Sequence, residues 1–276
     1  MLTKSRALIY PSHMPPNARV EVPKPSDFGI SDFEELVIPT SDGEKLSAFY
    51  IRGPRGGRNS NVTVLMFHGN AGNIGHRIPI ARMIVNYVGC NVFMLEYRGY
   101  GLSTGEPDEN GLHVDGQTAL DYLRSRAETS DHKLIIYGQS LGGAVGIRLV
   151  ARNQEAGDIA ALILENTFLS MRKLIPSVIP MAKYVTYLCH QVWPSDTVIP
   201  QITKVPILFL SGQQDEIVPY VFPLPPSLVY DLISFVDSIL PFITALFRFV
   251  LFESPCVMVP PPEMEANNAH RHMLVR

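Results

Sequence analysis

The fold is indicated most strongly by one stretch, Lys133-Leu134-Ile135-Ile136-Tyr137-Gly138-Gln139-Ser140-Leu141-Gly142. Its first five residues form a short apolar run typical of a buried strand, and residues 141–153 have helical periodicity. The pattern Gly-x-Ser-x-Gly between a strand and a helix is typical of a nucleophile elbow, a strained turn that exposes a serine hydroxyl. We therefore predict that Ser140 is a nucleophile. The alternative interpretation is a glycine-rich turn with a merely structural serine.

A second motif, Phe67-His68-Gly69-Asn70-Ala71-Gly72-Asn73, directly follows the apolar run of residues 62–67. Acyl transfer develops negative charge on the carbonyl oxygen of the substrate, and two converging backbone N–H groups stabilise that charge. The predicted pair is the N–H of Leu141 in the elbow and the N–H of Asn70 in this loop. His68 stands at a strand end before a glycine, so we expect it to shape the loop and not to act as the base.

A third motif, Ser211-Gly212-Gln213-Gln214-Asp215-Glu216-Ile217-Val218-Pro219, follows the apolar run of residues 206–210. A carboxylate just beyond a buried strand, after the nucleophile in chain order, fits the acid that orients a catalytic histidine. Asp215 is the predicted acid. Glu216 is the alternative residue, and a solvated loop carboxylate is the alternative role.

The predicted base is the weakest part of this site, because only His270 and His272 follow Asp215. Both lie in Ala269-His270-Arg271-His272-Met273 and lack a neighbouring glycine. We expect both to be tail residues, and His272 is the candidate base.

Short apolar runs alternate with helical stretches from residue 61 onward, which is typical of buried parallel strands joined by crossover helices. The predicted strands are residues 62–67, 91–97, 133–137, 161–164 and 206–210, and the predicted helices are residues 77–87, 111–126 and 141–153. Residues 34–39 and 46–51, separated by Ser41-Asp42-Gly43, predict a hairpin. The predicted fold is therefore α/β, a mostly parallel sheet with helices on both faces.

Three regions complete the predicted organisation. Residues 1–30 contain five prolines and predict an extended N-terminal strap. Residues 31–219 form the predicted core, into which residues 169–192 insert a small apolar helical cap. Residues 220–276 are expected to be a divergent apolar segment followed by a polar tail.

The composition excludes several classes of protein. The chain of 276 residues is 46% hydrophobic and 18% charged, with a formal net charge of -3, which argues against disorder and against nucleic acid as a partner. Three widely spaced cysteines suggest neither a disulfide framework nor a metal site, and they favour a reducing compartment. The glycines of residues 99–105 do not match the spacing of a dinucleotide-binding loop, so no cofactor is expected.

The N-terminal residues have neither the apolar core of a signal peptide nor a membrane-spanning segment. We therefore expect an intracellular protein, cytoplasmic or membrane-associated, and not a secreted one. Residues 232–252 are apolar and about long enough to cross a bilayer, but they contain Asp237 and Arg248. Each central charge costs roughly 2.5 to 3.5 kcal/mol on insertion, so a buried helix is expected instead.

Taken together, these motifs resemble the fungal bud-emergence (BEM-type) branch of the α/β-hydrolases and its animal α/β-hydrolase-domain relatives. The resemblance covers residues 8–219, and the further matching pieces are Leu8-Ile9-Tyr10-Pro11, Thr40-Ser41-Asp42-Gly43, Tyr97-Arg98-Gly99-Tyr100-Gly101, Glu165-Asn166-Thr167-Phe168 and Trp193-Pro194-Ser195-Asp196. The resemblance implies an α/β-hydrolase fold and a serine esterase or thioesterase, acting on small-molecule, acyl-protein or lipid-linked substrates. Family members are usually tethered to membranes by an N-terminal hydrophobic segment.

The sequence departs from the family after Pro219. The resemblance implies a further helix and strand and then a glycine-flanked histidine, whereas residues 220–259 are continuously apolar. The dipeptides Val218-Pro219 and Val259-Pro260 bracket this stretch, and family members continue from that dipeptide into proline and then methionine. We hypothesise that about forty residues here are a translated intron or another error in the gene model. The alternative function is accordingly a catalytically impaired, membrane- or polarity-related interaction protein with a hydrolase fold.

Overall fold

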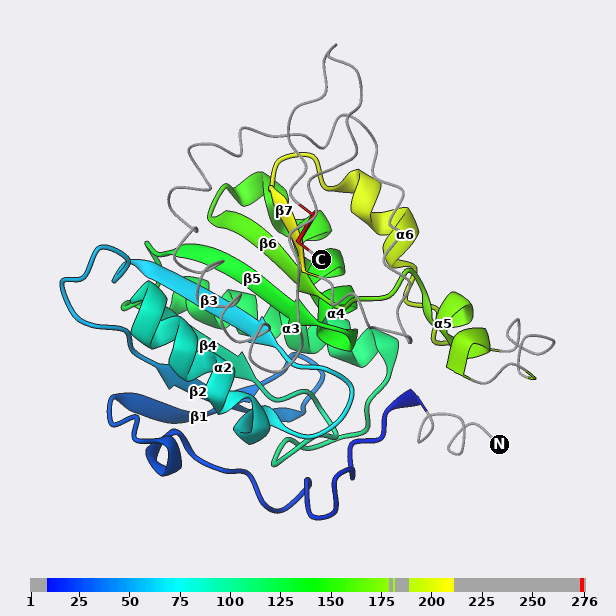
Figure 1. Cartoon of the computed structure of the whole chain (residues 1–276), viewed down its shortest axis with the longest axis horizontal. Coiled ribbons are helices and arrows are strands. Elements are labelled where there is room, and N and C mark those ends of the chain that lie inside the picture. Colours follow the sequence, from blue (N-terminus) through cyan, green and yellow to red (C-terminus); the bar gives the residue numbers. More distant parts are fainter. Residues whose placement is uncertain (1–8, 179–180, 182–188, 211–273, 276) are drawn as a thin grey trace, which may run out of the picture.

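The computed structural model describes residues 9–178, 181, 189–210 and 274–275. These residues form one sheet with the strand order β1-β2-β4-β3-β5-β6-β7-β8 (Figure 1). The strands are β1 Phe33–Pro39, β2 Lys45–Ile51, β3 Val62–Phe67, β4 Asn91–Leu95, β5 Lys133–Gln139, β6 Ile159–Glu165, β7 Ile207–Leu210 and β8 Leu274–Val275. Strand β1 pairs antiparallel with β2, and β2 pairs antiparallel with β4. All further pairings along the sheet, from β4 to β8, are parallel.

Helices cover both faces of this sheet, as the sequence predicted. Figure 1 shows α2 (Ile78–Met83) on one face and α3 (Glu109–Ser125) and α4 (Leu141–Asn153) on the other. Each face therefore has its own apolar core, and every residue of β4 is buried. Burial on both faces explains why the central strands are continuous apolar runs and do not alternate with polar residues.

The boundaries of two predicted elements match the structure. Strand β3 covers residues 62–67 and helix α4 covers residues 141–153, as predicted. The predicted helix over residues 77–87 is confirmed as part of an unbroken helical segment of mixed type, in which the 3-10 turn η2 (Ile74–Arg77) leads into α2 and then into a π-helical turn η3 (Ile84–Val88). Pro79 lacks an N–H group and fits only the first turn of α2, and Gly89, with φ 73°, ends η3.

The strap, described from residue 9, lies over the domain but is not simply extended. It consists of successive turns followed by the 3-10 helix η1 (Pro25–Phe28). Tyr10 is buried there, and its hydroxyl donates to Gln191 Oε1 at 2.6 Å and accepts from Trp193 Nε1 at 2.9 Å. The strap is thus fixed to Gln191 at the end of the cap and to Trp193 just after it.

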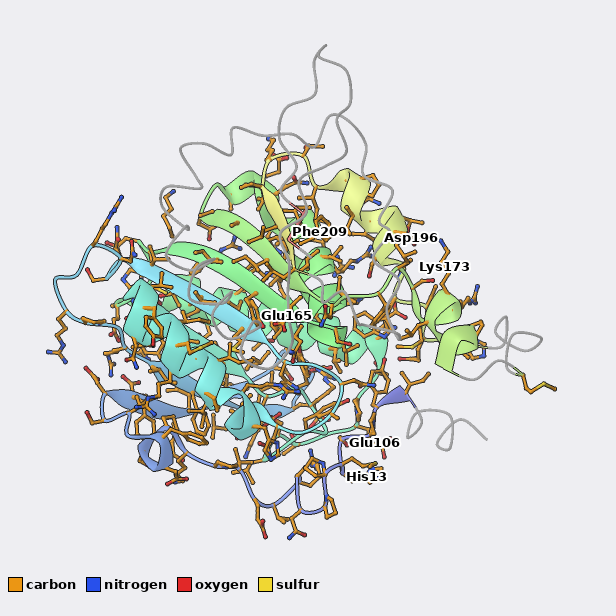
Figure 2. All side chains as sticks on the ribbon, viewed as in Figure 1. His13, Glu106, Glu165, Lys173, Asp196 and Phe209 are labelled. Atoms are coloured by element: carbon orange, nitrogen blue, oxygen red, sulfur yellow. The ribbon has the colours of Figure 1, made fainter. Side chains whose placement is uncertain are left out.

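The cap begins with helix α5 (Met171–Val178), whose Met171 is buried in the same apolar core as α3 and α4. Residues 179–180 and 182–188 of the predicted cap lie outside the described residues. The chain returns through α6 (Ser195–Val198) and the 3-10 turn η7 (Ile199–Gln201). Lys173 and Asp196, labelled together in Figure 2, form an ion pair of 2.5 Å between α5 and α6.

The predictions for residues 211–273 lie outside the described residues. Beyond them, Leu274 and Val275 form β8 and pair with Phe209 and Leu210, where the sequence predicted a polar tail and not a strand. No helix in the described ranges has the length and apolarity that crossing a bilayer requires.

Candidate active site

Ser140 stands at the junction of β5 and α4 in a strained backbone conformation, with φ 50° and ψ −112°. Positive φ is costly for a residue with a side chain and persists only where the surroundings enforce it. Here the Ser140 N–H donates to Glu165 O at 2.8 Å, and its carbonyl accepts from Gly143 N at 3.0 Å and Thr167 Oγ1 at 2.7 Å. Three hydrogen bonds thus hold the predicted nucleophile in its turn.

The flanking glycines are required by close backbone approach. A Cβ on Gly138 would lie 2.6 Å from the carbonyl carbon of Gly142. A Cβ on Gly142 would lie 2.6 Å from the carbonyl carbon of Phe67 and 2.8 Å from His68 O. Real Cβ atoms do not approach backbone this closely, so the Gly-x-Ser-x-Gly pattern is explained by the contact between the elbow and the end of β3.

The predicted oxyanion loop lies beside the elbow because β3 pairs with β5, Phe67 opposite Gly138. The side chain of Asn70 is fixed, since its Nδ2 donates to Ile9 O and its Oδ1 accepts from the Tyr100 hydroxyl at 2.9 Å. Within the described part of the chain, the backbone N–H groups of Asn70 and Leu141 have no hydrogen-bond acceptor. Both donors therefore remain available to a substrate oxygen.

His68 is buried, with 2% of its surface exposed. Its Nδ1 donates to Gly69 O at 2.7 Å, since a carbonyl oxygen can only accept, and its Nε2 lies 3.1 Å from Glu96 Oε1. The ring packs against Tyr97, with 4.3 Å between ring centroids. Both ring nitrogens therefore face fixed neighbours within the loop, which supports a loop-shaping role.

Glu165 and Thr167 are contributors to the elbow that the sequence did not predict as site residues. Glu165 ends β6, as Figure 2 shows, and its carboxylate accepts hydrogen bonds from the Tyr137 hydroxyl and from Gln139 Nε2, the latter at 3.3 Å. Burial raises the pKa of the Glu165 carboxyl above its usual range. The only sequence signal for them was their place in the family-matching stretch Glu165-Asn166-Thr167-Phe168.

The predicted acid and base, Asp215 and His272, lie outside the described residues, as do the alternatives Glu216 and His270. Strand β7 ends at Leu210, which pairs with Glu165, and Asn166 N donates to Leu210 O at 2.9 Å. The chain thus leaves β7 at the same edge of the sheet at which Ser140 leaves β5. No histidine in the described ranges is hydrogen-bonded to Ser140.

Among residues 9–178, 181, 189–210 and 274–275, no group of three or more His, Cys, Asp or Glu side chains could hold a metal ion. The glycine-rich turn of residues 99–105 is used for internal packing, since a Cβ on Gly101 would lie 2.5 Å from the Glu96 carboxyl carbon. A Cβ on Gly99 would lie 3.0 Å from Pro107 N.

Comparison with known proteins supports the same fold. The family model of serine aminopeptidase, S33, matches residues 58–204. The protein bem46 of Schizosaccharomyces pombe is 45% identical over 225 residues, which are 81% of this chain and 72% of that protein. The membrane protein YNL320W of Saccharomyces cerevisiae is 42% identical over 77% of this chain and 72% of its own length.

Two solved structures have the same architecture. An α/β hydrolase of Vibrio vulnificus has a TM-score of 0.66 at 20% identity and covers 78% of each chain. The esterase Pf2001 of Pyrococcus furiosus has a TM-score of 0.56 at 20% identity and covers 73% of this chain and 78% of that chain. At this identity both likenesses concern the fold.

Proposed function

This chain belongs to the serine aminopeptidase S33 family of α/β hydrolases, with bem46 among its relatives, and on that premise we propose that it is a serine hydrolase cleaving carboxylic ester or thioester bonds. The observation that carries the proposal is the strained turn at Ser140, because such strain concentrates at functional sites. The three hydrogen bonds that hold this turn, between the end of β5 and the start of α4, support the same role for Ser140.

In the proposed reaction, Ser140 Oγ attacks the carbonyl carbon of the substrate while a base takes its proton. The N–H groups of Asn70 and Leu141 stabilise the oxyanion, which collapses and expels the alcohol or thiol with that proton. Water then attacks the acyl-enzyme, releasing the acid and restoring Ser140. From chain order, Asp215 is the proposed orienting acid and His272 the candidate base.

The proposed substrates are small-molecule esters, or acyl-protein or lipid-linked esters and thioesters. Association with membranes enters the proposal through YNL320W, which is named a membrane protein. The cap residue Met171 is in the core, so helix α5 contributes at least part of its apolar surface to packing and not to a substrate pocket.

The test is hydrolysis by the full chain of p-nitrophenyl esters and acyl thioesters of increasing chain length, with an aminoacyl p-nitroanilide for comparison. Ser140→Ala is expected to lower kcat on the order of 10⁴- to 10⁶-fold. Ser125→Ala is the matched control, because Ser125 is an exposed serine of α3 whose hydroxyl donates only to Tyr122 O. Equal rates for Ser140→Ala and wild type, or preferred cleavage of the anilide, would contradict the proposal.

The second candidate is the catalytically impaired interaction protein. The observation that favours it is in the sequence, where only His270 and His272 follow Asp215 and neither has a neighbouring glycine. Folded protein that hydrolyses none of these substrates would support this candidate in place of the enzyme.

A further inference from the structure

A small cavity lies away from Ser140, between α3, α4 and the segment that follows the cap. Its volume is about 120 Å³, and its lining includes Glu109, His113, Ile147, Arg148, Trp193 and Ser195. Arg148 lies eight residues beyond Ser140 on α4 (148 − 140), a rise of roughly 12 Å along the helix axis. The lining residue nearest to Ser140 along α4 is Ala144, one helical turn away, and Ser140 itself does not line the cavity.

Three residues that line this cavity each have a buried polar atom without a hydrogen-bond partner among the described residues: His113 Nδ1, Arg148 Nε and Ser195 Oγ. Ser195 is only 3% exposed. Buried polar groups are nearly always paired, and each exception needs an explanation. The three atoms belong to residues from three separate segments that all line one cavity, and their unmet hydrogen-bonding capacity favours a polar ligand there.

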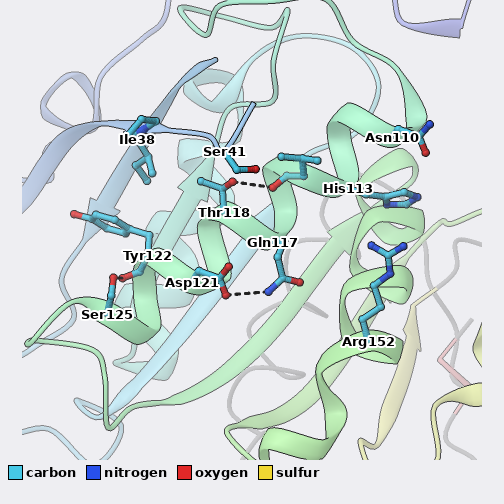
Figure 3. Close-up of a pocket in the computed structure, with 12 residues that line it drawn as sticks. Ile38, Ser41, Asn110, His113, Gln117, Thr118, Asp121, Tyr122, Ser125 and Arg152 are labelled. Atoms are coloured by element: carbon cyan, nitrogen blue, oxygen red, sulfur yellow. Dashed lines mark hydrogen bonds between the residues drawn. The ribbon is translucent and has the colours of Figure 1, made fainter. Parts of the chain in front are cut away.

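The charges around the cavity favour an anion. Arg148 and Arg152 are four residues apart and lie on one face of α4, and Figure 3 shows Arg152 reaching toward His113. Burial and these two arginines lower the pKa of His113 to about 4, so this imidazole is neutral at pH 7. The cavity thus presents two permanent positive charges and a neutral imidazole.

Glu109 is the one carboxylate that lines this cavity, and its oxygens are already used. They accept hydrogen bonds from Val192 N at 2.6 Å and Trp193 N at 3.0 Å. Its negative charge offsets part of the arginine charge, and no hydrogen bond joins it to any of the three unpaired atoms.

A wider groove of about 750 Å³ adjoins the cavity and shares Asn110, His113 and Arg152 with it (Figure 3). Its lining includes the apolar surfaces of Ile38 and Tyr122. An occupant with an anionic end in the cavity can therefore place an organic body in the groove.

We propose that the cavity binds the phosphate group of a small phosphate monoester whose organic body occupies the adjoining groove. A tetrahedral phosphate accepts hydrogen bonds from several directions, which matches donors on α3, α4 and the start of α6. Arginine guanidinium groups suit phosphate by both charge and geometry. The site does not depend on the reaction at Ser140.

The test is isothermal titration of the full chain with inorganic phosphate, phenyl phosphate and benzoate. Phenyl phosphate is expected to bind more tightly than inorganic phosphate because its ring enters the groove. Arg148→Gln removes a charged donor and should weaken phosphate binding by about tenfold or more. Arg82→Gln, at an exposed arginine of α2 on the opposite face of the sheet, is the matched control and should bind as wild type does.

Ser195→Ala is a second variant that keeps the proposal testable if Arg148→Gln does not fold. It removes a hydroxyl that has no partner in the described residues. It should keep the wild-type unfolding midpoint and still weaken phosphate binding. The absence of saturable binding to wild type, which is the result for a cavity filled by water alone, would overturn the proposal. So would equal affinities of wild type, Arg148→Gln and Ser195→Ala, or tighter binding of benzoate than of phenyl phosphate.

Discussion

Gly142 allows the elbow and the end of β3 to lie in close contact, because it has no Cβ. Gly142→Ala forces a Cβ against backbone atoms of Phe67 and His68 that cannot move independently of the sheet. Such overpacking is expected to lower the free energy of unfolding by more than about 2 kcal/mol. Urea denaturation measures this loss.

Gly146→Ala is the matched control on the same helix. The three atoms nearest to its Cβ would all be side-chain atoms, the methyl groups of Ile136 at 3.2 Å and Leu162 at 3.3 Å and a ring carbon of Phe67 at 3.9 Å, and alanine is the better helix former. Its stability should stay within about 1 kcal/mol of wild type. Equal losses in the two variants would contradict the account of the elbow glycines.

Thr167→Val replaces the hydroxyl that donates to Ser140 O with a methyl group of similar size. We expect a loss of about 1 kcal/mol in stability and a several-fold slower reaction of Ser140 with a fluorophosphonate, because the turn is less firmly held. Thr118→Val is the control, since Thr118 Oγ1 donates to Val114 O at 2.8 Å within α3, far from the elbow. If both variants react as fast as wild type, Thr167 does not position Ser140.

At the scale of elements, Tyr10 connects the strap to the segment that follows the cap. Tyr10→Phe leaves the buried Trp193 Nε1–H without its acceptor, so it should lower the free energy of unfolding by roughly 1 to 3 kcal/mol. Tyr87→Phe, at a residue that is 58% exposed, is expected to have almost no effect. The strap would be energetically independent of this segment if the two variants unfolded at the same denaturant concentration.

The elements that the sequence predicted best are those with local signals. Strand β3 and helix α4 follow from an apolar run and a helical period, and both match their predicted bounds. The predicted helix over residues 77–87 lies within the helical segment of residues 74–88, but the periodicity did not reveal its 3-10 start or its π-helical end. Strand β8 could not be predicted, because two residues become a strand only when a neighbour such as β7 pairs with them.

The site shows the same division between local and distant signals. Ser140, Leu141 and Asn70 were predicted because each belongs to a motif within a few residues of a strand end. The support of Ser140 by Glu165 and Thr167 comes from the neighbouring strand, and no local pattern records it. The three buried unpaired atoms at the proposed phosphate-binding cavity likewise belong to residues from three separate segments of the sequence.

At the scale of the whole molecule, Glu128, just after α3, is bonded to Arg52, just after β2. Its carboxylate accepts from Arg52 Nε at 2.5 Å and Nη2 at 3.0 Å, and these bonds, followed by the contact with Arg126, lower its pKa to about 2. A carboxyl group whose pKa is lower in the folded than in the unfolded protein stabilises the folded state at pH values above its unfolded pKa. That contribution is lost as the pH falls from about 4.5 toward 2.

Glu128→Gln should therefore destabilise the protein at pH 7 by no more than about 1 kcal/mol, because the pair is partly solvent-screened. The difference in melting temperature between variant and wild type should shrink as the pH is lowered through this window. A difference that stays constant from pH 7 to pH 2.5 would show that the charge of Glu128 contributes nothing.

The nucleophilic role of Ser140 is tested most directly by reacting the full chain with a fluorophosphonate and locating the adduct by peptide mass spectrometry. We predict one adduct per chain, on Ser140, that is absent in Ser140→Ala and retained in Ser125→Ala. An adduct on another serine, or none on protein shown to be folded, would contradict the assignment of Ser140 as the nucleophile.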